Sequence, residues 1–136
     1  MTKTLPSELL RVVDANLNRL KEGIRVIEDI ARYVHNDKNL STSLKNLRHQ
    51  CRIEPLEALL SSRDSVNDVL RPTMQSEMNR TDVRSILIAN YKRGQESSRV
   101  LEEIYKIITP EMSEMFKQIR YELYTLEKEN ILGLGN

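Results

Sequence analysis

The stretch ANLNRLKEGIRVIEDI at residues 15–30 recurs without gaps as ANYKRGQESSRVLEEI at residues 89–104, and eight of the sixteen positions are identical. Further along the chain, KNLR at residues 45–48 corresponds to KQIR at residues 117–120 at nearly the same offset. Self-similarity within one chain marks a structural unit that is present more than once. The sequence therefore predicts two copies of one motif.

Each copy has the pattern of a helical hairpin. From residue 7 to about residue 35, apolar residues recur at intervals of three and four, the period of an α-helix. Ser41 is expected to cap a second helix, and Pro55 is expected to break or kink it before a short continuation. These segments predict an antiparallel hairpin of two helices.

The second copy carries its own start signals. Thr81 is expected to cap a third helix that runs to about residue 108, and Thr109 followed by Pro110 marks the start of a fourth. Four packed helices are the smallest unit able to bury the apolar faces of both hairpins. We therefore expect an all-α bundle.

The length of 136 residues suits one domain, residues 1–136. We divide it into a first repeat at about 7–60, a connecting loop at 61–81 and a second repeat at about 82–130. The loop is about as long as structureless connections become inside compact domains, and such loops are often functional.

Composition excludes several classes of protein. Basic and acidic residues nearly cancel, at 21 against 20, so no bulk field would draw the chain to nucleic acid or to an anionic membrane. Cys51 is the single cysteine, which excludes an intramolecular disulfide and suits a reducing compartment. No apolar run has the length of a signal peptide or membrane span. We expect a cytoplasmic protein without a nucleic-acid or membrane partner.

Polar residues recur on the inward side of the first and third predicted helices. On a helical wheel, two asparagine and arginine pairs fall inside the apolar arcs and two glutamates fall at their borders: Asn16, Arg19, Asn90, Arg93, Glu22 and Glu96. A buried guanidinium is costly unless it is paired. Either the glutamates neutralise the arginines three residues away, or an anionic ligand binds between the hairpins.

Two further repeated features concern the same interior. Arg48 and Arg120 flank the apolar stripes of the second and fourth helices, which would bring four repeat-related arginines towards one interior. Gly23 and Gly94 lie inside predicted helices, where each costs about 1 kcal/mol relative to alanine. Close helix crossing explains such glycines, and room for a flat ligand is the alternative.

The connecting loop contains RDSVND at residues 63–68. Its Arg63, Asp64 and Asp68 have a spacing that places two carboxylates near one Mg²⁺ and an arginine near a phosphate, although ordinary turn chemistry also uses these residue types. The chain has no GxxxxGK[ST] phosphate loop. A bound nucleotide would therefore depend on arginines, helix N-termini and metal.

Taken in order, DANLNRLKEGIRVIEDIARY, LKNLRHQ, SRDSVNDV, ANYKRGQESSRVLEEIYKI and IRYELYTLEK cover nearly the whole chain. This set resembles the small hydroxymethylpyrimidine-phosphate kinases of thiamin biosynthesis, which occur alone or fused ahead of a thiamin-phosphate synthase domain. One departure lies after Val69, where Leu70 and Arg71 replace the expected glycine and threonine.

The resemblance implies transfer of the ATP γ-phosphoryl group to 4-amino-5-hydroxymethyl-2-methylpyrimidine phosphate, with Mg²⁺ as cofactor. It implies catalytic roles for Arg19, Arg93, Arg63, Asp64 and Asp68, of which Asp64 and Asp68 would also hold the metal. Substrate contacts are expected from Asn16, Asn90, Glu22, Glu96, Arg48 and Arg120. A thiamin-phosphate synthase is the expected protein partner, and a homodimer, with a site between hairpins or between subunits, stays open.

Two other classes of protein fit part of the pattern. One is a different small helical enzyme, similar to chorismate mutase, whose arginines bind a dicarboxylate without ATP or metal. The other is a non-catalytic helical module that assembles through its outer faces, which are here charged rather than apolar.

Overall fold

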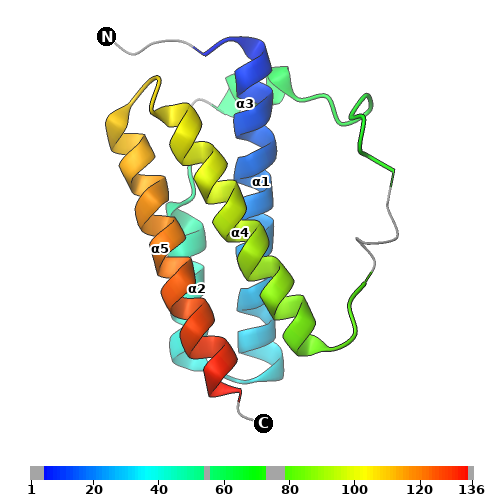
Figure 1. Ribbon diagram of the computed structural model, residues 1–136, viewed down its shortest axis with the longest axis vertical. Coiled ribbons are helices and arrows are strands. Elements are labelled where there is room, and N and C mark those ends of the chain that lie inside the picture. Colours follow the sequence, from blue (N-terminus) through cyan, green and yellow to red (C-terminus); the bar gives the residue numbers. More distant parts are fainter. Residues whose placement is uncertain (1–4, 54–55, 73–78, 135–136) are drawn as a thin grey trace.

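The computed structural model describes residues 5–53, 56–72 and 79–134, and within these ranges it is all-α, with no strand. In the described part of the chain, five α-helices and one π-helical turn follow one another (Figure 1). They are α1 (Ser7–Asp29), η1 (Ile30–Val34), α2 (Lys38–Gln50), α3 (Leu56–Ser62), α4 (Val83–Tyr105) and α5 (Pro110–Gly133). The four long helices confirm the predicted bundle, and α3 is the short continuation expected after the second helix.

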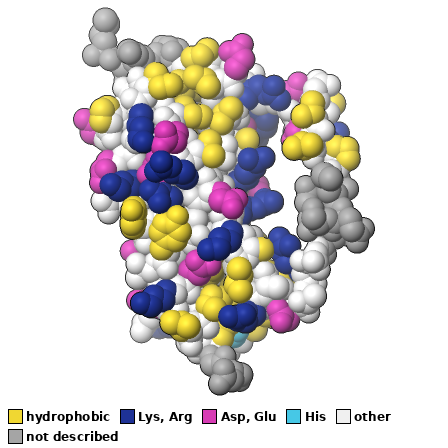
Figure 2. Space-filling view, in the orientation of Figure 1, with side chains coloured by type: hydrophobic (Ala, Val, Ile, Leu, Met, Phe, Trp, Pro, Cys, Tyr) yellow, Lys and Arg dark blue, Asp and Glu magenta, His cyan; other side chains and the backbone are white. Residues whose placement is uncertain are grey.

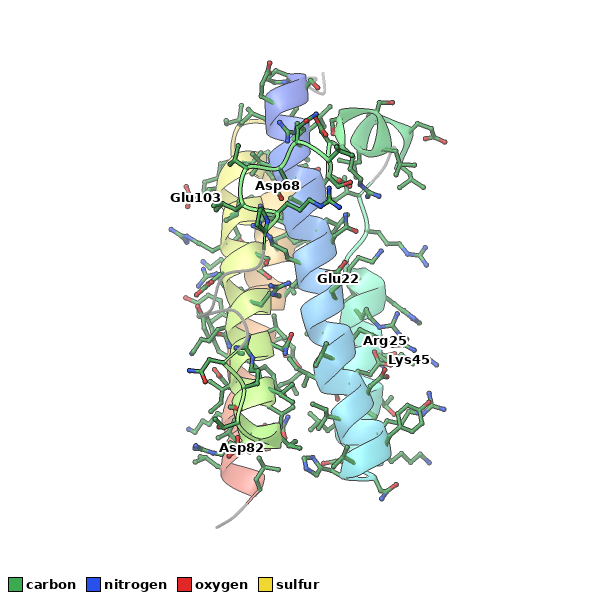
Figure 3. The ribbon with its side chains drawn as sticks, turned by 90° about the vertical axis from the view of Figure 1, so that its right-hand side faces the viewer. Glu22, Arg25, Lys45, Asp68, Asp82 and Glu103 are labelled. Atoms are coloured by element: carbon green, nitrogen blue, oxygen red, sulfur yellow. The ribbon has the colours of Figure 1, made fainter. Side chains whose placement is uncertain are left out.

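Helices α1 and α4 form the middle of the bundle. They pack directly against each other, while α2 packs on α1 and α5 packs on α4 (Figure 1). The connection from α3 to α4 leaves one end of the bundle and rejoins it at the other. In Figure 3 the described residues 63–72 of this connection lie in front of the seam between α1 and α4. We call this line of contact the α1–α4 seam.

The first hairpin turns at the end of η1. Asn36 has a positive φ of 52° there, and Asp37 then caps α2 by accepting a hydrogen bond of 3.0 Å from the backbone N–H of Leu40. Ser41, the cap expected from the sequence, lies inside α2 and its hydroxyl donates to the Asp37 carbonyl at 2.6 Å. The sequence-based cap was therefore wrong by one turn, because an aspartate upstream already provides the acceptor.

The residue that caps α4 also differs from the predicted one, here by a single position. Asp82, not Thr81, caps the helix, and its carboxylate accepts from the backbone N–H of Ser85 at 2.7 Å. The Ser85 hydroxyl in turn accepts from the backbone N–H of Asp82 at 3.1 Å, which completes a capping box. Helix α5 begins at Pro110 directly after Thr109, as predicted.

Gly23 in α1 and Gly94 in α4 both lie where two helices approach closely. A Cβ atom on Gly23 would lie 3.1 Å from the backbone oxygen of Asn90 across the α1–α4 seam. A Cβ atom on Gly94 would lie 3.0 Å from Cδ1 of Leu123 in α5. Close helix crossing, rather than room for a ligand, therefore explains both residues.

The core is a continuous set of buried aliphatic and aromatic residues from all the long helices. Tyr91 is fully buried within it, and its hydroxyl accepts a hydrogen bond of 2.8 Å from the Asn130 amide. Pro55, the expected helix breaker, lies outside the described residues. None of the helices in the described ranges is both long enough and apolar enough to cross a bilayer.

Candidate functional site

Two adjoining cavities open along the α1–α4 seam. The larger has a volume of about 650 Å³ and lies between α1 and residues 63–68 of the connection. The smaller has a volume of about 410 Å³ and lies between α1 and α4. Asn16, Arg19 and Arg93 line both, so the two cavities meet at these residues. Figure 2 shows Lys and Arg side chains along the hollow between the bundle and the connection.

Arg19 and Arg93 lie on the open seam and not in the core. Both are exposed, and neither forms an ion pair within 4 Å to any residue that the structure describes. Glu22 and Glu96 do not neutralise them and are themselves exposed, Glu22 in the larger cavity and Glu96 in the smaller. The expectation of burial was wrong for these two arginines, and so was the alternative of internal salt bridges with Glu22 and Glu96.

The two repeated asparagines make equivalent hydrogen bonds within their own helices. The Asn16 amide donates to the Val12 carbonyl, and the Asn90 amide donates to the Ile86 carbonyl, both at 2.8 Å. Asn16 nevertheless borders both cavities, whereas the backbone of Asn90 faces Gly23 at the helix crossing. The structure therefore brings Asn16, but not Asn90, to the cavities.

Arg48 and Arg120 are held away from the seam by buried glutamates. Arg48 donates from Nε and Nη2 to the Glu28 carboxylate at 2.7 and 3.3 Å. Arg120 donates to both oxygens of Glu102, from Nε to Oε2 and from Nη2 to Oε1 at 3.0 Å. In each pair the hydrogen bond to the carboxylate raises the pKa of the arginine above its ordinary value. The expected convergence of four arginines is therefore wrong, because two of them hold the hairpins together.

The sequence analysis missed Glu28 and Glu102 as the partners of these arginines. Both are identical positions of the repeat and lie just outside the apolar arc of their helix. The signal that could have predicted these pairs is a glutamate repeated in one helix of each hairpin together with an arginine repeated in the other helix. The wheel of one helix does not show this pairing, because it does not contain the neighbouring helix that carries the arginine.

The connection is attached to α1 through another acid that the sequence analysis missed. Arg63 donates from Nε and Nη2 to the two carboxylate oxygens of Asp14, both at 2.7 Å. The Asp14 residue is only 5% exposed. Its counterpart in the second repeat is Ile88, so comparison of the repeats gives no signal for it. Arg63 therefore positions the connection over the larger cavity.

Asp64 and Asp68 both line the larger cavity and both stabilise a turn. The Asp64 carboxylate accepts from the backbone N–H of Asn67 at 3.0 Å and from its amide at 2.9 Å. The side-chain hydrogen bond is the main cause of a lowered pKa for Asp64, so this carboxylate stays ionised. Asp68 accepts from the backbone N–H of Leu70 at 3.0 Å. The two aspartates therefore stabilise turns, as ordinary turn residues do, and also line the cavity.

These features define a duplicated helical-hairpin protein with two charged cavities along the α1–α4 seam. The chain belongs to the ThiD2 family, which matches residues 11–129. Among curated proteins, a thiamine-phosphate synthase of Synechocystis sp. is 40% identical over 98% of this chain and 39% of its own length. A thiamine-phosphate synthase of Rhodopirellula baltica is 35% identical over 95% of this chain and 36% of its own length.

The chain therefore spans less than two fifths of the length of these relatives. No solved structure matches it.

Proposed function

We propose that the protein is a kinase that transfers the γ-phosphoryl group of ATP to 4-amino-5-hydroxymethyl-2-methylpyrimidine phosphate, in thiamin biosynthesis. The observation that carries this proposal is the position of Arg19 and Arg93, without an acidic partner among the described residues, where two cavities meet. Membership of the ThiD2 family and likeness to proteins named thiamine-phosphate synthase support it, because such a synthase would consume the diphosphate.

Charge neutralisation is the main requirement of this reaction. The acceptor is a phosphate monoester whose second pKa is about 6, so near neutral pH it is mostly a dianion and needs no strong general base. Arginine binds phosphate oxygens through a planar fork of N–H donors. We assign Arg19 and Arg93 the role of stabilising the negative charge that accumulates when the two phosphates come together.

Residues of the larger cavity fit a magnesium nucleotide. The described residues contain no group of three or more side chains able to hold a metal ion. Mg²⁺ with a nucleotide needs only one or two protein carboxylates, because phosphate oxygens and water supply the remaining ligands. Asp64 and Asp68 would provide those carboxylates, and the ion would offset charge on the transferring phosphoryl group.

The other two classes of protein fit the structure less well. An enzyme for a single dicarboxylate, similar to chorismate mutase, gives no reason for a second cavity lined by Asp64 and Asp68. A non-catalytic module gives no reason for Arg19 and Arg93 to lie where two cavities meet, without an acidic partner among the residues that the structure describes. We propose a thiamin-phosphate synthase as the partner that receives the product.

An assay with Mg²⁺, ATP and the pyrimidine monophosphate tests the proposal by mass detection of the pyrimidine diphosphate and ADP. Asp64→Asn and Asp68→Asn should lower kcat by about 10-fold or more if the carboxylates act at the metal. Glu103→Gln, on the outer face of α4, is the control and should retain activity. Absence of ADP and diphosphate with the unaltered protein would refute the kinase assignment.

A further inference from the structure

The two seam cavities differ in charge. In the larger cavity Arg63 is neutralised by Asp14, which leaves three arginines against four carboxylates, Glu8, Glu22, Asp64 and Asp68. Because Lys92 pairs with Glu127 at 3.4 Å, the smaller cavity is left with two arginines, Arg19 and Arg93, against the single carboxylate of Glu96. The larger cavity is thus suited to a polyphosphate that arrives with a metal cation, and the smaller to an anion without one.

Size and wall composition point the same way. The larger cavity, at about 650 Å³, has more than one and a half times the volume of the smaller, at about 410 Å³. The smaller cavity has apolar surface from Ala89 and Val100 beside polar groups from Ser97 and Glu96, which suits a small, flat heterocycle with polar edges. In Figure 3, Asp68 lies in the connection in front of the seam, on the same side of the molecule as Glu22.

From these differences we propose that the seam holds two separate subsites that meet at Arg19 and Arg93. The smaller cavity binds the pyrimidine phosphate monoester, and the larger binds the magnesium nucleoside triphosphate. This assignment rests on the proposed kinase function and adds which cavity takes which substrate. The repeat has therefore diverged, so that one side of the seam binds the donor and the other binds the acceptor.

Separate subsites on the two sides of the arginines match the geometry of the transfer. An oxygen of the acceptor phosphate forms a bond to the γ-phosphorus while the bond from that phosphorus to the β–γ bridging oxygen breaks, and the nucleoside diphosphate leaves with the electron pair. The attacking oxygen is already ionised, so no proton has to be removed. Donor and acceptor approach the phosphorus from opposite sides, which two cavities that meet at one point allow.

The repeat itself supplies a matched pair of test variants. Ala15 lines only the larger cavity, and Ala89, its counterpart in the second repeat, lines only the smaller. Leucine has a helix propensity close to that of alanine, so each substitution adds bulk to one cavity and leaves the helix intact. Binding of each ligand alone, by titration calorimetry, reports on each cavity separately.

Ala89→Leu should weaken binding of the pyrimidine monophosphate by roughly tenfold and leave binding of a nonhydrolysable magnesium ATP analogue unchanged. Ala15→Leu should do the reverse. The opposite pattern, or equal weakening of both ligands by both variants, would overturn the subsite assignment while leaving the kinase activity in place. If the unaltered protein binds neither ligand, the proposed function fails together with the assignment.

A second pair of variants tests charge and keeps the assignment falsifiable if a leucine variant does not fold. Lys92 and Arg11 are exposed and line only the smaller and the larger cavity respectively. Lys92→Gln should weaken the monophosphate and Arg11→Gln the nucleotide analogue, each by roughly fivefold, since one cation is removed near the phosphates. The assignment would be contradicted if Lys92→Gln weakened binding of the nucleotide analogue and left binding of the monophosphate unchanged.

Discussion

The guanidinium of Arg48 binds the buried carboxylate of Glu28 through hydrogen bonds of 2.7 and 3.3 Å, and Arg120 with Glu102 repeats this pair in the second hairpin. Each pair joins the two helices of one hairpin. Recurrence of both members at equivalent positions is the structural counterpart of the sequence repeat. It separates the arginines of this chain into two groups, those that hold the fold and those that face the cavities.

The paired group predicts a large loss of stability on substitution. Arg120→Met leaves Glu102, which is 2% exposed as a residue, with Arg99 at 3.8 Å as its remaining cationic partner among the described residues. The free energy of unfolding should fall by about 3–5 kcal/mol in urea titrations. Adding Glu102→Leu to this variant should recover most of the loss, because the buried carboxylate that lost its hydrogen-bonded partner is then gone. A single variant as stable as the unaltered protein would show that the pair contributes nothing.

The unpaired group predicts the opposite. Arg19→Met and Arg93→Met remove positive charge that no described acidic residue neutralises within 4 Å, so the melting temperature should stay equal or rise while kinase activity is lost. Arg25→Met is the matched control. It removes an exposed arginine of α1 that pairs with Asp29 at 3.4 Å, and it should keep activity. A melting temperature many degrees lower in the Arg19 or Arg93 variant would assign that arginine to the fold.

Gly23→Ala tests the close crossing of α1 and α4. The added methyl group would lie 3.1 Å from the backbone oxygen of Asn90 and 3.7 Å from Cγ of Arg93. Because a backbone atom cannot rotate away, we expect a loss of about 1–3 kcal/mol in urea titrations despite the better helix propensity of alanine. Gly133→Ala, whose methyl group would meet no atom within 4 Å, should be neutral or slightly stabilising. Equal effects of the two substitutions would mean that the seam can open at no cost.

Cys51 predicts a pH dependence of stability. Burial raises the pKa of its thiol to about 12 from an ordinary value of 9.0. Above about pH 9 the unfolded chain releases this proton while the folded chain retains it, so the contribution is complete below pH 9 and is lost as pH rises towards 12. The stability difference between the unaltered protein and Cys51→Ala should therefore shrink between pH 7.5 and pH 10. A constant difference would contradict a buried, protonated thiol.

Local patterns in the sequence predicted the fold because helical periodicity and start signals act within a few residues. The long helices, the start at Pro110 and the close approach at Gly23 follow from such patterns. The site was only partly predictable. Whether Arg19 faces a cavity and Arg48 faces a glutamate depends on which helices pack together, and the wheel of one helix does not contain that information. Asp14 was missed because its partner, Arg63, lies 49 residues away with no counterpart in the repeat.

If Arg19 and Arg93 bind an acceptor that already carries a phosphate, as proposed, two acceptors that differ only in this phosphate should react at different rates. We would measure kcat/KM with Mg²⁺ and ATP for the pyrimidine monophosphate and for the free pyrimidine alcohol. The monophosphate should be preferred by at least about a hundredfold, because the alcohol leaves the arginines without an anion. Comparable kcat/KM values for the two acceptors would show that Arg19 and Arg93 do not select a phosphorylated acceptor.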